Sequence, residues 1–335
     1  MITLGVETSC DETAVSLVED QCVISSEVSS SVHLHSQYGG VVPEIASRFH
    51  TEYIYSVLDK ALKDAGKTID EVDLVSVTGE PGLPGSLLVG KVFADAIGMA
   101  AKIPVIGVNH VQAHVMSCFI NEDNRVDNMA EKYPFLALVV SGGHTSLYVF
   151  RSLEDFEEIG RTRDDAIGEA FDKVAKILEL GYPGGPIVEK FAAQFAETGR
   201  TTKNDIIDFP RALLKDEGDL DFSFSGIKTA VLYYWRKAQQ SEEEKRRVCY
   251  SFQEAVFDVL EKKILRAVKM TRVSRIAVGG GVIHNNLLRS RLGSLCRENK
   301  CDLFIPENIF CTDNAAMVAV LGENLYRLRQ ERGGQ

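Results

Sequence analysis

Two stretches of this 335-residue chain repeat one pattern, and the repeat limits the folds that the chain can adopt. In each stretch an apolar strand runs into a turn of small polar residues and then into a second strand, at residues 2–18 and again at 135–150. Strand and helix patterns alternate after each hairpin. The sequence therefore predicts an α/β protein of two related domains, whose two hairpin turns meet at a central cleft. Backbone N–H groups in such turns are suited to binding phosphate.

The expected elements outside the hairpins follow from apolar periodicity and from Pro and Gly boundaries. Pro43 is expected to begin a helix that stops near Gly66. Further strands are expected at 74–77, 103–108, 276–278 and 303–305. Further helices are expected after the Gly-rich segment at 78–85, around 110–114, at 169–180, 186–195, 251–270 and 312–328, and from about 285. The charged stretch 241–247 is expected to be an exposed turn or a helix start.

Composition narrows the class of protein. Hydrophobic residues make up 45% of the chain and charged residues 25%, as in soluble globular proteins. Charged residues interrupt the longest apolar region, 87–108, and no signal segment opens the chain, so neither a membrane span nor export is expected. The odd number of cysteines, seven, with no C-x-x-C pair, favours a reducing, cytoplasmic setting.

The net charge of −11 argues against nonspecific binding of nucleic acid by the whole surface. One segment is locally basic and could form a patch for RNA, although a solvated helix face is the simpler interpretation of such a run. Its basic residues are Lys262, Lys263, Arg266, Lys269, Arg272 and Arg275.

Two histidines one helical turn apart, His110 and His114 in V-N-H-V-Q-A-H-V, form a candidate metal site. Both imidazoles would project from one helix face and could occupy two positions on an ion. The zinc-protease motif has Glu directly after the first His, and this chain has Val111 there. Asp313, in C-T-D-N-A-A-M, is either a helix-capping residue or a third, anionic ligand that leaves open positions for substrate.

Glycine clusters at 184–185 and 279–281 are candidate nucleotide-binding turns, although each could be an ordinary tight turn. Glycine lets a base or a phosphate approach the backbone closely. Asn285 could bond an adenine edge or a ribose hydroxyl, and Asp172 could accept from ribose hydroxyls. The phosphate-binding motif of P-loop proteins is absent from the sequence.

The first hairpin turn carries two carboxyl groups, Asp11 and Glu12, which are candidates for proton transfer or metal binding. A solvated turn is the alternative interpretation. Cys10 beside them has no histidine base nearby in sequence, which argues against a cysteine nucleophile.

Many longer motifs occur in one order along the chain, and together they resemble a known family. They are G-V-E-T-S-C-D-E-T, H-S-Q-Y-G-G-V-V-P-E-I-A-S-R-F-H, N-H-V-Q-A-H, V-S-G-G-H-T, G-E-A-F-D-K-V-A-K, Y-P-G-G-P, D-F-S-F-S-G-I-K-T, G-G-G-V-I-H-N-N-L-L-R and C-T-D-N-A-A-M. The chain resembles the bacterial TsaD family over nearly its whole length. That resemblance implies an actin-like ATPase (ASKHA) fold. It also implies an N-terminal subdomain at 1–130 completed by a C-terminal helix at 312–335, and a second subdomain at 131–311 carrying the adenylate-binding motifs.

The resemblance also implies a reaction, a metal and partners. The reaction is transfer of a threonylcarbamoyl group from threonylcarbamoyl-AMP to N6 of the adenosine 3′ of the anticodon in tRNAs reading ANN codons, with release of AMP. One divalent ion per subunit is implied, Fe²⁺ or Zn²⁺ first and Mg²⁺ next. ATP, ADP or AMP can occupy the adenylate site. The partners besides tRNA are a smaller paralogous protein of the same fold (TsaB-like) and a P-loop ATPase (TsaE-like).

By motif match, the family's metal ligands fall on His110, His114 and Asp313. The substrate loop falls on Val139, Val140, Ser141, Gly142 and Gly143, and the adenylate contacts fall on Asp172, Gly185, Glu189 and Asn285. Archaeal relatives have a tyrosine ligand just before the S-G-G-type turn. This chain has Val140 there, so the coordination sphere must be completed in another way.

Two other functions remain open at the level of sequence. A metal-dependent glycoprotein peptidase needs a water-activating base, and the absence of Glu after His110 counts against it. A non-catalytic nucleotide-binding scaffold would bind nucleotide without turnover, and the His-His-Asp set counts against it.

Overall fold

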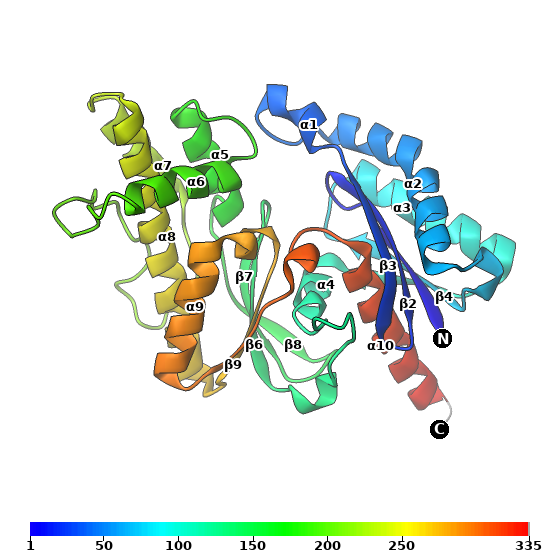
Figure 1. Ribbon diagram of the computed structural model, residues 1–335. Coiled ribbons are helices and arrows are strands. Elements are labelled where there is room, and N and C mark those ends of the chain that lie inside the picture. Colours follow the sequence, from blue (N-terminus) through cyan, green and yellow to red (C-terminus); the bar gives the residue numbers. More distant parts are fainter. Residues whose placement is uncertain (334–335) are drawn as a thin grey trace. The chain divides into compact units, whose positions relative to one another are not determined.

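The structure is a computed structural model that describes residues 1–333, so the last two residues of the helix expected at 312–335 lie outside the described chain. Contacts divide the chain into two compact units. Unit 1 comprises residues 1–131 and the chain from Ile305 onward, and unit 2 comprises residues 132–304. Figure 1 shows both units as helices packed on a sheet.

Unit 1 contains a five-stranded sheet in the order β3-β2-β1-β4-β5. Its strands are β1 (Ile2–Glu7), β2 (Glu12–Glu19), β3 (Cys22–Ser30), β4 (Leu74–Glu80) and β5 (Val105–Asn109). The first three strands are antiparallel neighbours, whereas β4 and β5 run parallel to β1. The expected hairpin and the two later strands are confirmed. The edge strand β3 was not expected, because serines occupy much of it and leave a weak apolar pattern.

Unit 2 repeats this topology, with the order β10-β9-β6-β7-β8. Its strands are β6 (Phe135–Val140), β7 (Thr145–Phe150), β8 (Phe156–Arg161), β9 (Arg275–Gly279) and β10 (Asp302–Phe304). Again three antiparallel strands come first and two parallel strands are added beside the first of them. The identical strand arrangement confirms two related α/β domains.

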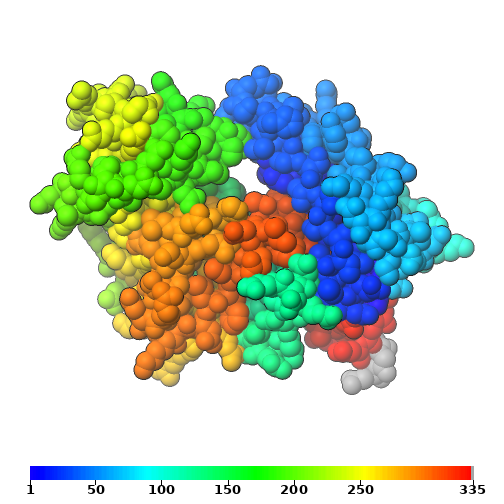
Figure 2. Space-filling view, viewed as in Figure 1, coloured from blue at the N-terminus to red at the C-terminus, as the bar shows by residue number. Residues whose placement is uncertain are grey.

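Helices cover both faces of the sheet in unit 1. The helices of unit 1 within the described residues are α1 (Val32–His35), η1 (Ser36–Tyr38), α2 (Pro43–Ala65), η2 (Ile69–Glu71), α3 (Pro84–Ala101), α4 (His110–Ser117), η3 (Met129–Glu131), η5 (Asn308–Phe310) and α10 (Ala315–Gly333). Pro43 begins α2 and Gly66 ends it in the left-handed conformation, as expected. Leu4 and Val6 of β1 pack in one core with Ile54 of α2. In Figure 2, α2 lies on the visible surface of unit 1 in light blue.

The other face of β1 is covered by α10, which comes from the far end of the chain. A Cβ atom at Gly5 would lie 2.2 Å from the Ala315 carbonyl oxygen and 2.9 Å from Ala319. The hydroxyl of Ser76 on β4 donates to the Val318 carbonyl at 2.7 Å. The absence of a side chain at Gly5 therefore lets α10 approach the sheet closely.

The helices of unit 2 are α5 (Ile167–Ile177), α6 (Gly184–Ala196), α7 (Ser225–Trp235), α8 (Glu242–Thr271), η4 (Gly281–His284) and α9 (Asn286–Asn299). The charged stretch 241–247 is a helix start, because the Ser241 side chain accepts from the Glu244 N–H and caps α8. Helix α7 was not expected from the sequence. Within residues 1–333, no helix is long and apolar enough to cross a membrane.

Candidate metal centre and nucleotide-binding turns

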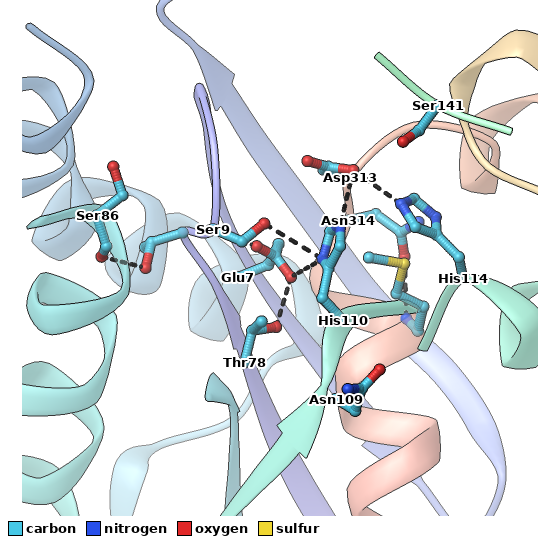
Figure 3. A network of polar contacts seen from close by, with 12 residues as sticks. Glu7, Ser9, Thr78, Ser86, Asn109, His110, His114, Ser141, Asp313 and Asn314 are labelled. Atoms are coloured by element: carbon cyan, nitrogen blue, oxygen red, sulfur yellow. Dashed lines mark hydrogen bonds and ion pairs between the residues drawn. The ribbon is translucent and has the colours of Figure 1, made fainter. Parts of the chain in front are cut away.

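The two histidines of the candidate metal centre come from α4, which begins directly after β5. The Asn109 side chain accepts from the Gln112 N–H at 3.0 Å and caps this helix. Both imidazoles lie on one side of α4 with their ring centroids 4.6 Å apart, and both are buried. The helical spacing therefore places the two rings together, as the sequence predicts (Figure 3).

Asp313 joins this pair from the segment before α10. Its Oδ1 lies 3.6 Å from His110 Nε2 and 3.1 Å from His114 Nε2. The neighbouring Asn314 accepts from the Met317 N–H at 3.0 Å and so caps α10. One ligand atom from each of His110, His114 and Asp313 lies within 4.8 Å of the others.

Glu7 supports His110 and was not singled out in the sequence. Its carboxylate is fully buried, with Oε2 3.2 Å from His110 Nδ1. The Thr78 hydroxyl donates to Oε2 and the Ser9 N–H donates to Oε1. A proton on Nδ1 facing this carboxylate leaves the Nε2 lone pair toward Asp313, as in many metal-binding histidines. A glutamate inside the otherwise uncharged strand β1 was the available signal.

The electrostatics of this cluster favour a cation. Burial lowers the pKa of His110, but the carboxylates of Asp313 and Glu7 outweigh it and raise the pKa to about 9. His114 is fully buried, and neither of its ring nitrogens makes an aligned hydrogen bond. Its Nε2 is only close to Asp313, without hydrogen-bond geometry. A buried imidazole without a hydrogen bond, next to a carboxylate, fits one metal ion.

The turn at 9–12 carries Asp11 and Glu12, the two candidate groups for proton transfer or metal binding. Burial, together with the nearby Asp11 and Asp313 carboxylates, raises the pKa of Glu12 well above its ordinary range. Glu12 therefore holds its proton more tightly than an exposed glutamate does. Burial and Asp11 also raise the pKa of Cys10, so its thiol is a poor nucleophile.

In unit 2 the substrate loop follows β6. Val139 and Val140 are fully buried neighbours on β6, so their side chains are covered by protein on opposite faces of the sheet. The Ser141 N–H donates to the His144 carbonyl at 2.9 Å, so this backbone amide of the turn is already engaged within the protein. Within residues 1–333, a Cβ built at Gly142 or Gly143 would meet no atom within 4 Å apart from those of its chain neighbours. The two glycine amides therefore remain the candidates for binding an anion.

Other turns of unit 2 lie against this loop. Strands β6 and β9 are parallel neighbours, so their carboxyl ends meet at one edge of the sheet. Gly280, at φ +94°, packs on the Val140 carbonyl, where a Cβ would be 2.4 Å from the oxygen. Gly168 of α5 packs on Ser141 and Gly142, where a Cβ would be 2.7 Å from the Ser141 carbonyl oxygen. Gly168 was not singled out in the sequence.

The expected adenylate contacts have structural roles of their own. Asp172 accepts from the Gly184 N–H at 2.7 Å and holds the start of α6, next to the sterically open Gly185. Asn285 accepts from the Leu288 N–H and donates to Gln253 at 2.9 Å. Glu189 accepts from the backbone and the side chain of Asn286. Asn285 and Glu189 therefore already have hydrogen-bond partners within the protein.

The basic segment is only partly exposed. Lys263 is fully buried and donates to the Asp219 carbonyl. Arg266 donates to backbone carbonyls between 213 and 219, and Arg275 donates to those of Lys132 and Tyr133. Among residues 1–333, no backbone carbonyl accepts from the side chains of Lys262, Lys269 and Arg272, the other cations of this segment.

A solved structure agrees with the fold. Full-length HypF in its phosphate- and nucleotide-bound form aligns with a TM-score of 0.60 over 97% of this chain and 46% of that chain, at 12% identity. At this low sequence identity, the structural similarity shows a shared fold alone.

The sequence matches relatives over nearly its whole length. The family model for TsaD, tRNA N6-adenosine threonylcarbamoyltransferase, matches residues 22–320. A protein of that name from Syntrophus aciditrophicus is 44% identical over 328 residues, which cover 97% of this chain and 92% of the relative. A protein of the same name from Clostridium beijerinckii is 47% identical over 320 residues, which cover 95% and 90%. The chain therefore belongs to the TsaD family of tRNA N6-adenosine threonylcarbamoyltransferases.

Proposed function

We propose that this protein transfers a threonylcarbamoyl group from threonylcarbamoyl-AMP to N6 of the adenosine 3′ of the anticodon in tRNAs that read ANN codons. A bond forms between N6 and the carbamoyl carbon, the bond from that carbon to the phosphate oxygen breaks, and AMP leaves. Family membership supports the reaction class. The observation that supports the chemistry is the group formed by Asp313 and the buried His110 and His114, with Glu7 bonded to His110.

The metal centre follows from the donor set. Two imidazoles and one carboxylate suit Fe²⁺ or Zn²⁺, and open positions also admit Mg²⁺. When bound there, a divalent ion supplies a Lewis acid that stabilises negative charge on substrate oxygens. His110, His114 and Asp313 would hold it, and Glu7 would orient His110.

The chain's own groups position the substrate and accept a proton. The Gly142 and Gly143 amides would hold an anionic oxygen of the adenylate, and Gly185 would leave room for the nucleoside. N6 loses a proton as it attacks. Asp11 and Glu12, the two carboxyl groups on the first turn, are the candidate acceptors of that proton.

A reconstitution tests this function. Purified protein would be incubated with threonylcarbamoyl-AMP, unmodified tRNA and one defined metal, with and without partner proteins, and nucleosides would be measured by mass spectrometry. We expect His114→Ala to lose both bound metal and transfer, and His33→Ala, at an exposed histidine, to keep both. Full single-turnover transfer by His114→Ala would exclude the metal-assisted reaction.

We further propose that a smaller paralogous protein of the same fold binds an exposed apolar face of unit 1. Helix α3 exposes Leu88 (61%), Val92 (58%) and Met99 (81%) along one side, and α2 exposes Tyr55 (72%). Leu88→Glu with Val92→Glu should abolish co-elution with that paralogue, whereas Met270→Glu in unit 2 should not. A P-loop ATPase and tRNA complete the proposed partners, and the cytoplasm is the proposed location.

A further inference from the structure

The motif H-S-Q-Y-G-G-V-V-P-E-I-A-S-R-F-H begins at His35 and ends at His50, and the proposed reaction assigns neither residue a role. Both side chains are fully buried, although histidine is an uncommon core residue. Each makes two hydrogen bonds within unit 1, one of which links it to the turn at 9–12, directly for His50 and through Ser31 for His35.

His50 bonds this turn directly. Its Nε2 lies 3.0 Å from the Cys10 carbonyl oxygen, and its Nδ1 lies 2.8 Å from the Thr13 hydroxyl oxygen. A carbonyl oxygen only accepts, so Nε2 carries the proton and Nδ1 can accept from Thr13. Burial lowers the pKa of His50, which agrees with a neutral ring.

His35 acts through Ser31. The Ser31 hydroxyl and N–H both donate to the Asp11 carbonyl, at 2.8 and 2.9 Å. Because the hydroxyl proton is used there, the oxygen accepts from His35 Nε2–H at 2.9 Å. The Val42 N–H then donates to His35 Nδ1 at 3.2 Å. This chain of bonds ties the turn to the segment that leads into α2.

Three successive backbone carbonyls of the turn, those of Ser9, Cys10 and Asp11, accept hydrogen bonds from other residues of unit 1. The Ser9 carbonyl accepts from the Leu83 N–H at 2.8 Å, and those of Cys10 and Asp11 are engaged by the histidine networks. Among residues 1–333, no acceptor bonds the N–H of Cys10 or of Asp11. Fixing the carbonyls also fixes the orientation of these amides, because each peptide unit is planar.

We propose that His35 and His50 are positioning residues, which hold the turn so that the Cys10 and Asp11 amides bind an anionic oxygen of the substrate. This inference rests on the proposed function, since the adenylate supplies that oxygen as a phosphate or as the threonyl carboxylate. Neither histidine contacts the reacting atoms. Their effect passes through the backbone of the turn.

Selective isotope labelling tests the proposal without requiring activity. Protein labelled with ¹⁵N-cysteine has seven cysteine amides, of which Cys10 is assigned by substitution with serine. AMP and N-carbamoyl-L-threonine serve as separate probes for phosphate and carboxylate. We expect the Cys10 signal to shift with one of them, and ¹⁵N-histidine spectra to show neutral, Nε2-protonated rings at His35 and His50.

Three variants isolate the histidine contribution. His50→Leu removes the shorter of two hydrogen bonds to the Cys10 carbonyl oxygen, at 3.0 Å, and leaves the longer one from the Ser86 hydroxyl, at 3.4 Å. His50→Gln can still donate from its amide. Ser16→Ala is the control, since it removes a buried hydrogen bond of unit 1, from Ser16 of β2 to the Ser25 carbonyl, that does not involve the turn. We expect His50→Leu to lose the probe-induced shift and to raise KM for threonylcarbamoyl-AMP by about five- to tenfold, the cost of about one hydrogen bond. His50→Gln and Ser16→Ala should keep the shift and a KM near that of the parent protein.

The outcomes separate this inference from the proposed function. A Cys10 shift that persists unchanged in folded His50→Leu refutes positioning by the histidine. The absence of any Cys10 shift in the parent protein, with transfer intact, refutes anion binding by the turn but leaves the reaction standing. Unchanged signals from the other cysteines in each variant establish that the fold is intact.

Discussion

Glu7→Gln is the substitution that tests the metal centre most directly. The carboxylate of Glu7 faces donors on both oxygens: the Ser9 N–H at Oε1, and the Thr78 hydroxyl and His110 Nδ1 at Oε2. A glutamine has one oxygen and one NH₂ group. In either orientation its NH₂ meets a donor, so one side of the network is broken and a negative charge is lost.

The expected magnitude follows from that geometry. Loss of the group that orients a metal-binding histidine weakens metal binding by about ten- to a hundredfold, or about 1.4–2.8 kcal/mol. The assay is a titration of metal-free protein with Zn²⁺ and Fe²⁺ in competition with a chelator of known affinity. Glu323→Gln is the control, because Glu323 is also a fully buried glutamate of unit 1 but pairs with Arg327. A metal Kd for Glu7→Gln within twofold of the parent protein would refute the assignment of Glu7 as the support of His110.

Three further predictions concern the fold and the RNA surface. Asp164 accepts four hydrogen bonds at the start of α7. Desolvation raises the pKa of this carboxyl, but the four bonds outweigh it and lower the pKa from an ordinary 3.8 to about 2. Because folding lowers this pKa, the stabilisation by the carboxylate is present above pH 5 and is lost as the pH falls toward 2. Discounted for solvent exposure, it is about 1 kcal/mol. Asp164→Asn should therefore lower the free energy of unfolding by that amount at pH 7 and by almost nothing near pH 2. Gly5→Ala should destabilise the protein by about 2–3 kcal/mol in chemical denaturation, since its Cβ would overlap Ala315 of α10. Lys269→Glu with Arg272→Glu should weaken tRNA binding and reduce its salt dependence.

Two of these predictions have a control variant, and each has a result that would contradict it. Gly107→Ala, on β5 with open space around its Cβ, should leave stability nearly unchanged, and equal effects at the two glycines would contradict the close approach of α10. An Asp164→Asn effect that is the same at pH 7 and near pH 2 would contradict the carboxylate cap. Lys102→Glu, a charge reversal in unit 1, should leave tRNA affinity nearly unchanged, and equal losses in the two units would contradict a local RNA surface.

Local patterns in the sequence were sufficient for much of the fold. The two hairpins, α2 between Pro43 and Gly66, and the later strands follow from apolar periodicity and from residues with fixed backbone preferences. The elements that were missed have weak local signals. Strand β3 is rich in serine, β8 (F-E-E-I-G-R) is an edge strand with charged residues, and α7 begins within the aromatic and serine residues of D-F-S-F-S-G-I-K-T.

The sequence by itself determined the hairpin duplication, and the spacing that puts His110 and His114 on one side of a helix. Only the tertiary structure decided which residues surround them. In the structure, Asn314 caps α10 and Glu7 lies beside His110 Nδ1. His50 bonds the first turn directly, and His35 bonds it through Ser31. The physical reason is that periodicity describes neighbours within one element. The contact of Asp313 with the histidines depends instead on how α10 packs against β1 across Gly5.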